Sequence, residues 1–166
     1  MQKYELTQKI LSWGPSYEVK DAMAPSGADD VMVTIKGKLL SATPQLTMVQ
    51  GTDGAPAASM KGNFMKTKFE CFGASSETIG VLAFPMLALK KGFTITTNGQ
   101  EYKADGGFLG GEFKCTDQAG NVVLTIEKQL SLRDKFAITT TGALPRELAL
   151  LAAVAIDQRF FQDTYE

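Results

Sequence analysis

The chain has 166 residues, 44% of them hydrophobic, which is typical of one globular domain with a sizeable core. Its 17 Lys and Arg residues against 18 Asp and Glu leave a net charge of −1, so no overall positive field favours nucleic acid as a partner. Histidine is absent, which excludes serine–histidine and cysteine–histidine nucleophiles, histidine general bases and nearly every catalytic zinc arrangement. We expect a single domain over residues 1–166.

The spacing of the cysteines and the length of the apolar runs indicate the cellular compartment of the protein. The two cysteines lie 44 residues apart and form no Cys-x-x-Cys site, so we expect free thiols in a reducing environment. The first residues lack the apolar region of a signal peptide. The longest apolar runs, 79–89 and 148–156, are shorter than the ~20 residues that span a bilayer. We therefore expect a cytoplasmic protein, either free or peripheral to a membrane.

Along most of the chain, apolar residues alternate with polar ones, as in strands with one buried face. Turn-forming clusters separate these segments, and Asn98-Gly99 is the strongest hairpin signal. Short strands with regular turns are typical of a sandwich or a closed barrel. The pattern predicts about twelve strands, near residues 2–11, 16–20, 30–40, 45–49, 57–63, 66–72, 78–86, 92–97, 100–106, 111–116, 121–130 and 134–140.

The sequence contains an internal repeat. GNFMKTKFECF (62–72) and GGFLGGEFKCT (106–116) share a glycine, two phenylalanines and a cysteine at the same positions, and 89–97 resembles 132–140 further along. Units this short cannot each bury a face alone, so the copies must join in one sheet system.

The repeat predicts shape rather than chemistry. The glycine run at 106–111 lacks the Gly-Lys-Ser/Thr ending of a phosphate loop, so we interpret Gly110 and Gly111 as turn or bulge residues. Cys71 and Cys115 share strand parity with neighbouring phenylalanines, which directs them toward the core as small hydrophobes.

Residues 145–162 predict a helix, because Pro145 suits the first helical position and Glu147 falls in the first turn. Every residue from Leu148 to Ile156 is apolar, and a helix that is apolar on all sides must be buried on all sides. A sheet that wraps the helix is the obvious solution. The fold class is therefore all-β with one helix: an antiparallel β-barrel of about twelve strands enclosing a C-terminal apolar α-helix. The helix residues expected in its core are Leu148, Leu151, Val154 and Ile156.

This architecture resembles that of the tubby C-terminal-like proteins, and the sequence motifs resemble those of one branch best. Residues 106–139 followed by 148–163 resemble the LURP-one-related family, as do the opening strands at 4–21. Tubby relatives bind phosphoinositide headgroups through basic barrel residues, and scramblase relatives act on membranes. The resemblance implies the fold; no headgroup motif aligns with particular positions here.

Asp157 follows nine apolar residues, and a carboxylate near a barrel axis needs a partner or must be neutralised. One interpretation is a structural pair with a strand lysine, a hydroxyl or backbone N–H groups, or a place at the barrel mouth. The other is a ligand or cation site at the end of the helix.

Lysines form the other charge feature. Solvated lysines that protect strand edges explain them, and a patch for an anionic headgroup is the alternative. The candidate headgroup residues are Lys61, Lys66, Lys68, Lys90 and Lys91, with Lys36 and Lys38 on a separate strand.

The sequence shows no nucleophile motif, metal-ligand cluster, phosphate loop or diagnostic carboxylate pair, so we expect no catalytic residues, no metal, no cofactor and no enzymatic activity. The function indicated is a non-catalytic binding module that associates with anionic phospholipid or phosphoinositide through a basic barrel face. The alternative is a structural or protein-interaction subunit of a larger assembly. Exposed apolar residues in segment 83–89, Phe84 and Met86 among them, would favour that alternative.

Overall fold

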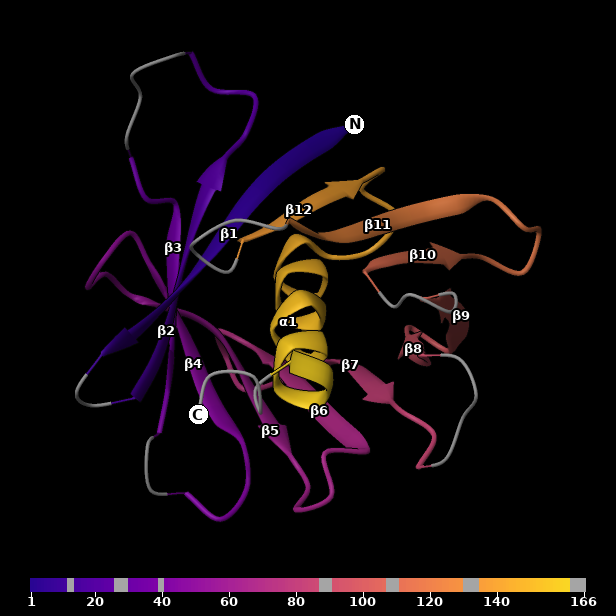
Figure 1. The fold of residues 1–166 in the computed structure, drawn as a ribbon, viewed down its shortest axis with the longest axis horizontal. Helices are drawn as coiled ribbons and strands as arrows, with labels where there is room; N and C mark the ends of the chain where they lie inside the picture. The colour runs from indigo at the N-terminus through magenta and orange to yellow at the C-terminus, as the bar shows by residue number, and fades with distance from the viewer. Residues whose placement is uncertain are drawn as a thin grey trace.

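The barrel is closed and entirely antiparallel. The computed structural model describes residues 1–11, 14–25, 30–38, 41–86, 91–106, 111–129 and 135–161. Within them each strand pairs with its neighbours in the chain, and β1 pairs with β12 to close the ring (Figure 1). The described strands are β1 (Gln2–Leu11), β2 (Gly14–Asp21), β3 (Val33–Gly37), β4 (Gln45–Gln50), β5 (Pro56–Gly62), β6 (Lys68–Gly73), β7 (Thr78–Ala83), β8 (Gly92–Thr97), β9 (Gln100–Asp105), β10 (Glu112–Thr116), β11 (Val122–Gln129) and β12 (Lys135–Thr140). The predicted fold class is confirmed.

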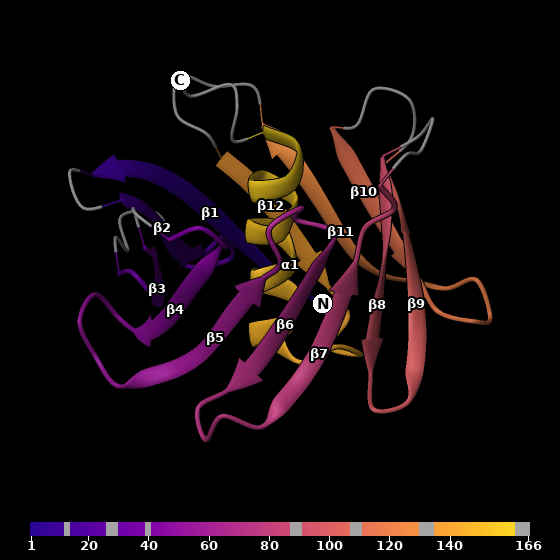
Figure 2. The same ribbon diagram turned by 90° about the horizontal axis from the view of Figure 1, so that it is seen from below.

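A single described helix fills the barrel. The α-helix α1 (Arg146–Ile156) continues into one π-helical turn, η1 (Asp157–Phe161), and runs inside the ring of strands (Figure 2). Every residue from Leu148 to Ile156 is fully buried. The structure thus places all four predicted core residues of the helix, Leu148, Leu151, Val154 and Ile156, out of contact with solvent.

The helix gives the barrel two distinct ends. Near the first turn of α1, Leu148 packs against Gly80 at the start of β7, where a Cβ atom would lie only 2.7 Å from Leu148 Cδ2. At the far end of the helix, Phe160 stacks on Phe113 at the start of β10. We call these ends the N-rim and the C-rim, after the helix terminus each one surrounds. Since the strands alternate in direction, every odd-numbered strand ends at the C-rim.

The repeated line of sequence has a packing explanation. Gly62 lies opposite Phe69 across β5 and β6, and a Cβ atom at Gly62 would lie 2.7 Å from the Phe69 ring. In the second copy, a Cβ atom at Gly106 would lie 2.6 Å from the ring of Phe113. Each glycine therefore leaves room for the ring of a core phenylalanine, which packs over its backbone. Such glycine–aromatic pairs help to fix the register and curvature of neighbouring strands.

Several predicted strand boundaries differ from the structure. The strand expected at 30–40 is shorter and spans only Val33–Gly37, whereas the strand expected at 16–20 extends over Gly14–Asp21. The strand expected at 66–72 begins at Lys68, because Lys66 adopts a left-handed conformation (φ 56°) that belongs to a turn rather than to a strand. The strand expected at 78–86 ends at Ala83. The turn at Asn98-Gly99 is confirmed, since both residues have the positive φ angles (50° and 74°) of a tight hairpin.

Candidate functional site

The polar residues that follow the apolar helix contact the barrel wall at β2. The hydroxyl of Tyr17 donates to Asp157 Oδ2 at 2.6 Å, and the side-chain amide of Gln158 donates to the same hydroxyl at 3.0 Å. Asp157 and Tyr17 are both fully buried. Among the partners that the sequence left open for Asp157, the structure therefore places a hydroxyl beside it. This contact joins the end of the helix to a strand 140 residues earlier in the chain.

Aromatic rings and cations pack together beyond this pair. Phe160 stacks on Phe113 with 5.8 Å between ring centroids, and Phe161 lies next to Phe160. The ammonium group of Lys91 lies 4.8 Å from the centre of the Phe161 ring, and that of Lys128 lies 3.8 Å from it. Cation–π contacts of this kind stabilise by about 0.5–2 kcal/mol. Lys91, a candidate headgroup residue, thus packs on the rings that close the C-rim.

The turn between β5 and β6 is held in one conformation by a single side chain. Asn63 Oδ1 accepts hydrogen bonds from the backbone N–H groups of Thr67 (2.8 Å) and Lys68 (3.2 Å), and its amide donates to Thr67 Oγ1 (2.8 Å). The Asn63 carbonyl also accepts from the N–H of Lys66 at 3.1 Å. An asparagine that bonds to the backbone ahead of it is a standard way to fix a turn. These hydrogen bonds fix the backbone of the turn without any ligand.

That tip is apolar and exposed. Phe64 is 73% exposed and Met65 is 51% exposed. The backbone N–H of Phe84 donates to Thr67 O at 2.7 Å, which sets the segment after β7 alongside this turn and brings Met86, 62% exposed, to the same rim. Phe84 itself is only 4% exposed and offers no docking surface. Large exposed apolar side chains gathered at one place mark interaction surfaces.

Lysines flank this turn on both strands. Lys61 and Lys68 are exposed on the outer face of β5 and β6, and Lys61 lies opposite Glu70. Lys38 and Lys66 line one pocket at the C-rim. We call the set Lys61, Phe64, Met65, Lys66 and Lys68 the hairpin surface.

The remaining candidate lysines do not form one group in the structure. Lys36 forms an ion pair with Asp53, with 2.9 Å between Nζ and Oδ1, so its charge is already compensated. Lys90 lies outside the described residues. The sequence analysis grouped these lysines because they are close in sequence. Closeness in sequence does not show which end of the barrel a side chain approaches.

The two rims carry opposite charge. In the described connections at the N-rim, every charged side chain is acidic; these are Asp30, Asp53, Glu77 and Asp117. In the described connections at the C-rim and in η1, the basic side chains are Lys38, Lys66, Lys91 and Arg159, and the acidic one is the buried Asp157. A net charge of −1 therefore hides an asymmetry between the connections at the two rims.

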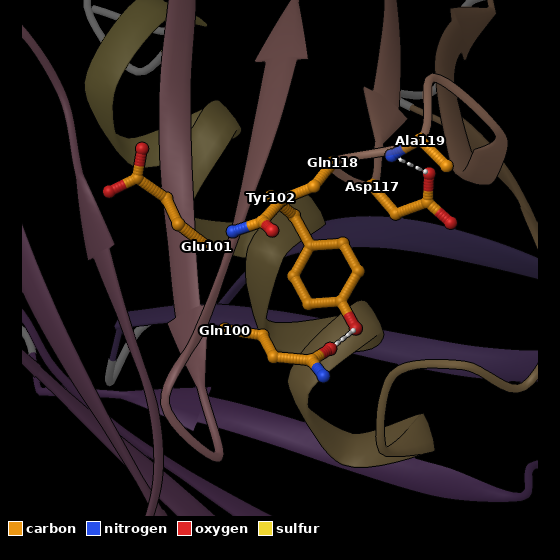
Figure 3. A pocket seen from close by; sticks show the side chains of 6 residues that line it. All are labelled: Gln100, Glu101, Tyr102, Asp117, Gln118 and Ala119. Atoms are coloured by element: carbon orange, nitrogen blue, oxygen red, sulfur yellow. Dashed lines mark hydrogen bonds between the residues drawn. The ribbon is translucent and has the colours of Figure 1, made fainter.

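A second pocket, of about 190 Å³, lies at the acidic N-rim (Figure 3). Its polar side chains shape the chain around it: the hydroxyl of Tyr102 donates to Gln100 Oε1 at 3.0 Å, and Asp117 Oδ1 accepts from the N–H groups of Ala119 and Asn121. The pocket therefore lies where the β8–β9 hairpin meets the β10–β11 hairpin. It supplies no cation or nucleophile for chemistry.

Among the described residues, no cluster of three or more His, Cys, Asp or Glu side chains could hold a metal ion. No helix in that part of the chain is both long enough and apolar enough to cross a bilayer. Both cysteines are buried free thiols, and burial raises the pKa of Cys71 and of Cys115 to about 12. A thiol that stays protonated at neutral pH is a poor nucleophile.

Comparison with known proteins places this barrel among relatives. An X-ray structure of a protein from Arabidopsis thaliana superposes with a TM-score of 0.60 over 99% of this chain and 92% of that one, at 11% sequence identity, which shows a shared fold. No curated protein matches the sequence with significance. The family model for LURP-one-related proteins matches residues 2–157, nearly the whole barrel together with the apolar helix. The chain therefore belongs to the LURP-one-related family.

Proposed function

We propose that the protein is a non-catalytic binding module that associates peripherally with anionic phospholipid membranes through the hairpin surface. The observation that carries this proposal is the pair Phe64 and Met65, exposed at the tip of a preformed turn and flanked by Lys61, Lys66 and Lys68. An apolar tip between basic side chains matches a membrane surface, where acyl chains lie below anionic headgroups. The tubby resemblance, with its phosphoinositide-binding members, points the same way.

The energies suit weak and reversible binding. Transferring the exposed parts of Phe64 and Met65 into the headgroup boundary contributes about 2–4 kcal/mol in total. Each lysine near an anionic leaflet adds about 1 kcal/mol, less where a carboxylate such as Glu70 lies nearby. A sum of about 5 kcal/mol corresponds to a dissociation constant of about 0.1–1 mM. Neither contribution suffices alone, which agrees with the two signals that stable peripheral attachment usually needs.

The charge asymmetry supports the same orientation. With the C-rim toward an anionic leaflet, the basic side chains approach the membrane and the acidic N-rim points away. The reverse orientation would bring Glu77 and Asp117 toward like charge. The protein thus needs no overall positive charge to dock in one direction.

Vesicle sedimentation tests this proposal. Wild type should pellet with vesicles of phosphatidylcholine containing phosphatidylserine or phosphoinositide, more strongly at low salt than at about 0.15 M, where the Debye length is about 8 Å. It should not pellet with phosphatidylcholine alone. The double variant Phe64→Ala, Met65→Ala should bind at least tenfold more weakly, and Lys61→Ala with Lys68→Ala should reduce the salt dependence.

A matched control comes from the opposite rim. Met23 is 61% exposed and Lys3 is exposed beside it, since the N–H of Ala22 donates to Lys3 O. The double variant Met23→Ala, Lys3→Ala removes the same kinds of side chain and should bind like wild type. Equal loss in the control and in the hairpin variant would show that the hairpin surface has no special role.

Exposed Met86 favours a second candidate, a subunit that docks on another protein. In that case the apolar side chains at the C-rim would meet a protein surface, and association would depend little on salt. Failure of wild type to pellet with any vesicle at low salt would leave this candidate in place of the membrane one.

A further inference from the structure

A pocket of about 160 Å³ opens at the C-rim between the β3–β4 connection and the hairpin surface. Two proline rings and Leu46 form part of its wall. The polar side chains that line it are Lys38, Ser41, Thr43, Gln45, Lys66 and Gln158. None of the described residues that line this pocket is acidic, and the buried Asp157 lies behind Gln158, joined to it through the Tyr17 hydroxyl. The site therefore presents two ammonium groups, two hydroxyls and the Gln45 amide, while the Gln158 amide already donates to Tyr17; the two charges that line it are both positive.

Lys66 reaches this pocket from a backbone conformation that lysine rarely adopts. Its φ of 56° lies in the left-handed region, which costs a residue with a Cβ atom about 1 kcal/mol relative to glycine. The internal repeat has a glycine at the corresponding position, Gly110. Glycine is what the backbone of such a turn prefers, so the lysine is present for its side chain rather than for the turn.

The size and chemistry of the pocket restrict its ligand. Pockets for drug-sized molecules have volumes of about 300–1,000 Å³, so this one takes a single small group. Ammonium groups bind phosphate as point charges, and hydroxyls and amides can share its remaining oxygen atoms. A phosphate monoester carries more charge than a diester and presents three terminal oxygens, which suits two lysines better than a carboxylate does.

We propose that this pocket binds a phosphate monoester group, with Lys38 and Lys66 as the charged contacts. The group could belong to a soluble phosphorylated metabolite or to a lipid headgroup. Because the pocket adjoins the hairpin surface, a lipid ligand would make it the headgroup site of the membrane-binding face; in that form the inference rests on the proposed function.

The soluble form of the ligand is tested first. Isothermal titration of the full chain with glycerol 3-phosphate should show saturable binding that Lys66→Gly weakens at least tenfold. Lys66→Gly suits this test because it relieves the left-handed strain, so its melting temperature should equal or exceed that of wild type. Lys38→Ala should weaken binding similarly. Lys103→Ala, at an exposed position on β9 outside the pocket, should bind like wild type.

The lipid form is tested with vesicles matched in surface charge. Phosphatidic acid, a monoester, should recruit wild type at least tenfold better than phosphatidylserine, and Lys66→Gly should abolish that preference. Binding to both lipids without preference, together with no binding of glycerol 3-phosphate, would overturn the pocket while leaving the membrane proposal intact. Binding of glycerol 3-phosphate with no vesicle binding would support the pocket as a soluble phosphate site and overturn the membrane proposal. No response in either assay would overturn the pocket.

Discussion

Replacing Tyr17 with phenylalanine removes one hydroxyl and leaves the buried carboxylate of Asp157 without that donor. It also removes the acceptor of the Gln158 amide, which is only 6% exposed. Losing a hydrogen bond to a charged group costs about 1.5–3 kcal/mol, and the second contact adds about 1 kcal/mol. We therefore expect Tyr17→Phe to destabilise the protein by about 3 kcal/mol.

In a protein of this size, 1 kcal/mol corresponds to a shift of about 2–4 °C in the melting temperature, so Tyr17→Phe should melt about 6–12 °C below wild type. Thermal unfolding followed by circular dichroism at neutral pH measures this. Tyr102→Phe is the matched control, because it removes a hydroxyl whose partner, Gln100, is exposed at a hairpin. That variant should lose about 1 kcal/mol or less.

A second substitution separates the charge from the packing. In the Tyr17→Phe background, Asp157→Asn should recover part of the lost stability, because it replaces a buried carboxyl group that no longer has the Tyr17 hydroxyl beside it. Melting of Tyr17→Phe within about 2 °C of wild type, or no difference from Tyr102→Phe, would refute the idea that this contact fastens the helix to the barrel wall.

Three further predictions concern the barrel interior. Gly80→Ala should destabilise by about 1–3 kcal/mol, because the new methyl group would overlap the fully buried Leu148; urea unfolding checks this, and Leu148→Ala in the same background should cost less than it does alone. Cys71 and Cys115 should react with iodoacetamide at pH 8 far more slowly in the native protein than in urea, and equal rates would contradict their burial. Since burial raises both pKa values from about 9 to about 12, their contribution to stability is complete below pH 9 and is lost as the pH rises toward 12. Alanine at both positions should flatten that part of the pH profile.

The sequence by itself determined the architecture, because the signals involved are local. Alternation with period two depends only on neighbouring residues, and it located most strands to within a few positions. The run from Leu148 to Ile156 has no polar side, so burial on every side was the one soluble arrangement, and the barrel followed from it. The repeated glycine and phenylalanine likewise predicted shape, and the structure shows the ring lying over the glycine.

Only the tertiary structure decided how the charged residues are grouped. Tyr17, which donates to Asp157, lies 140 residues away, and nothing near Tyr17 in the sequence marks this contact. Lys36, which looked equivalent to Lys38, is paired with Asp53 from the β4–β5 connection, whereas Lys38 lines a pocket with Lys66. When the barrel closes, every second strand connection along the chain comes to the same rim. The charge of each rim is therefore the sum of charges on segments that are far apart in sequence. Electrostatic interactions depend on distance in space, and a one-dimensional pattern does not contain that distance.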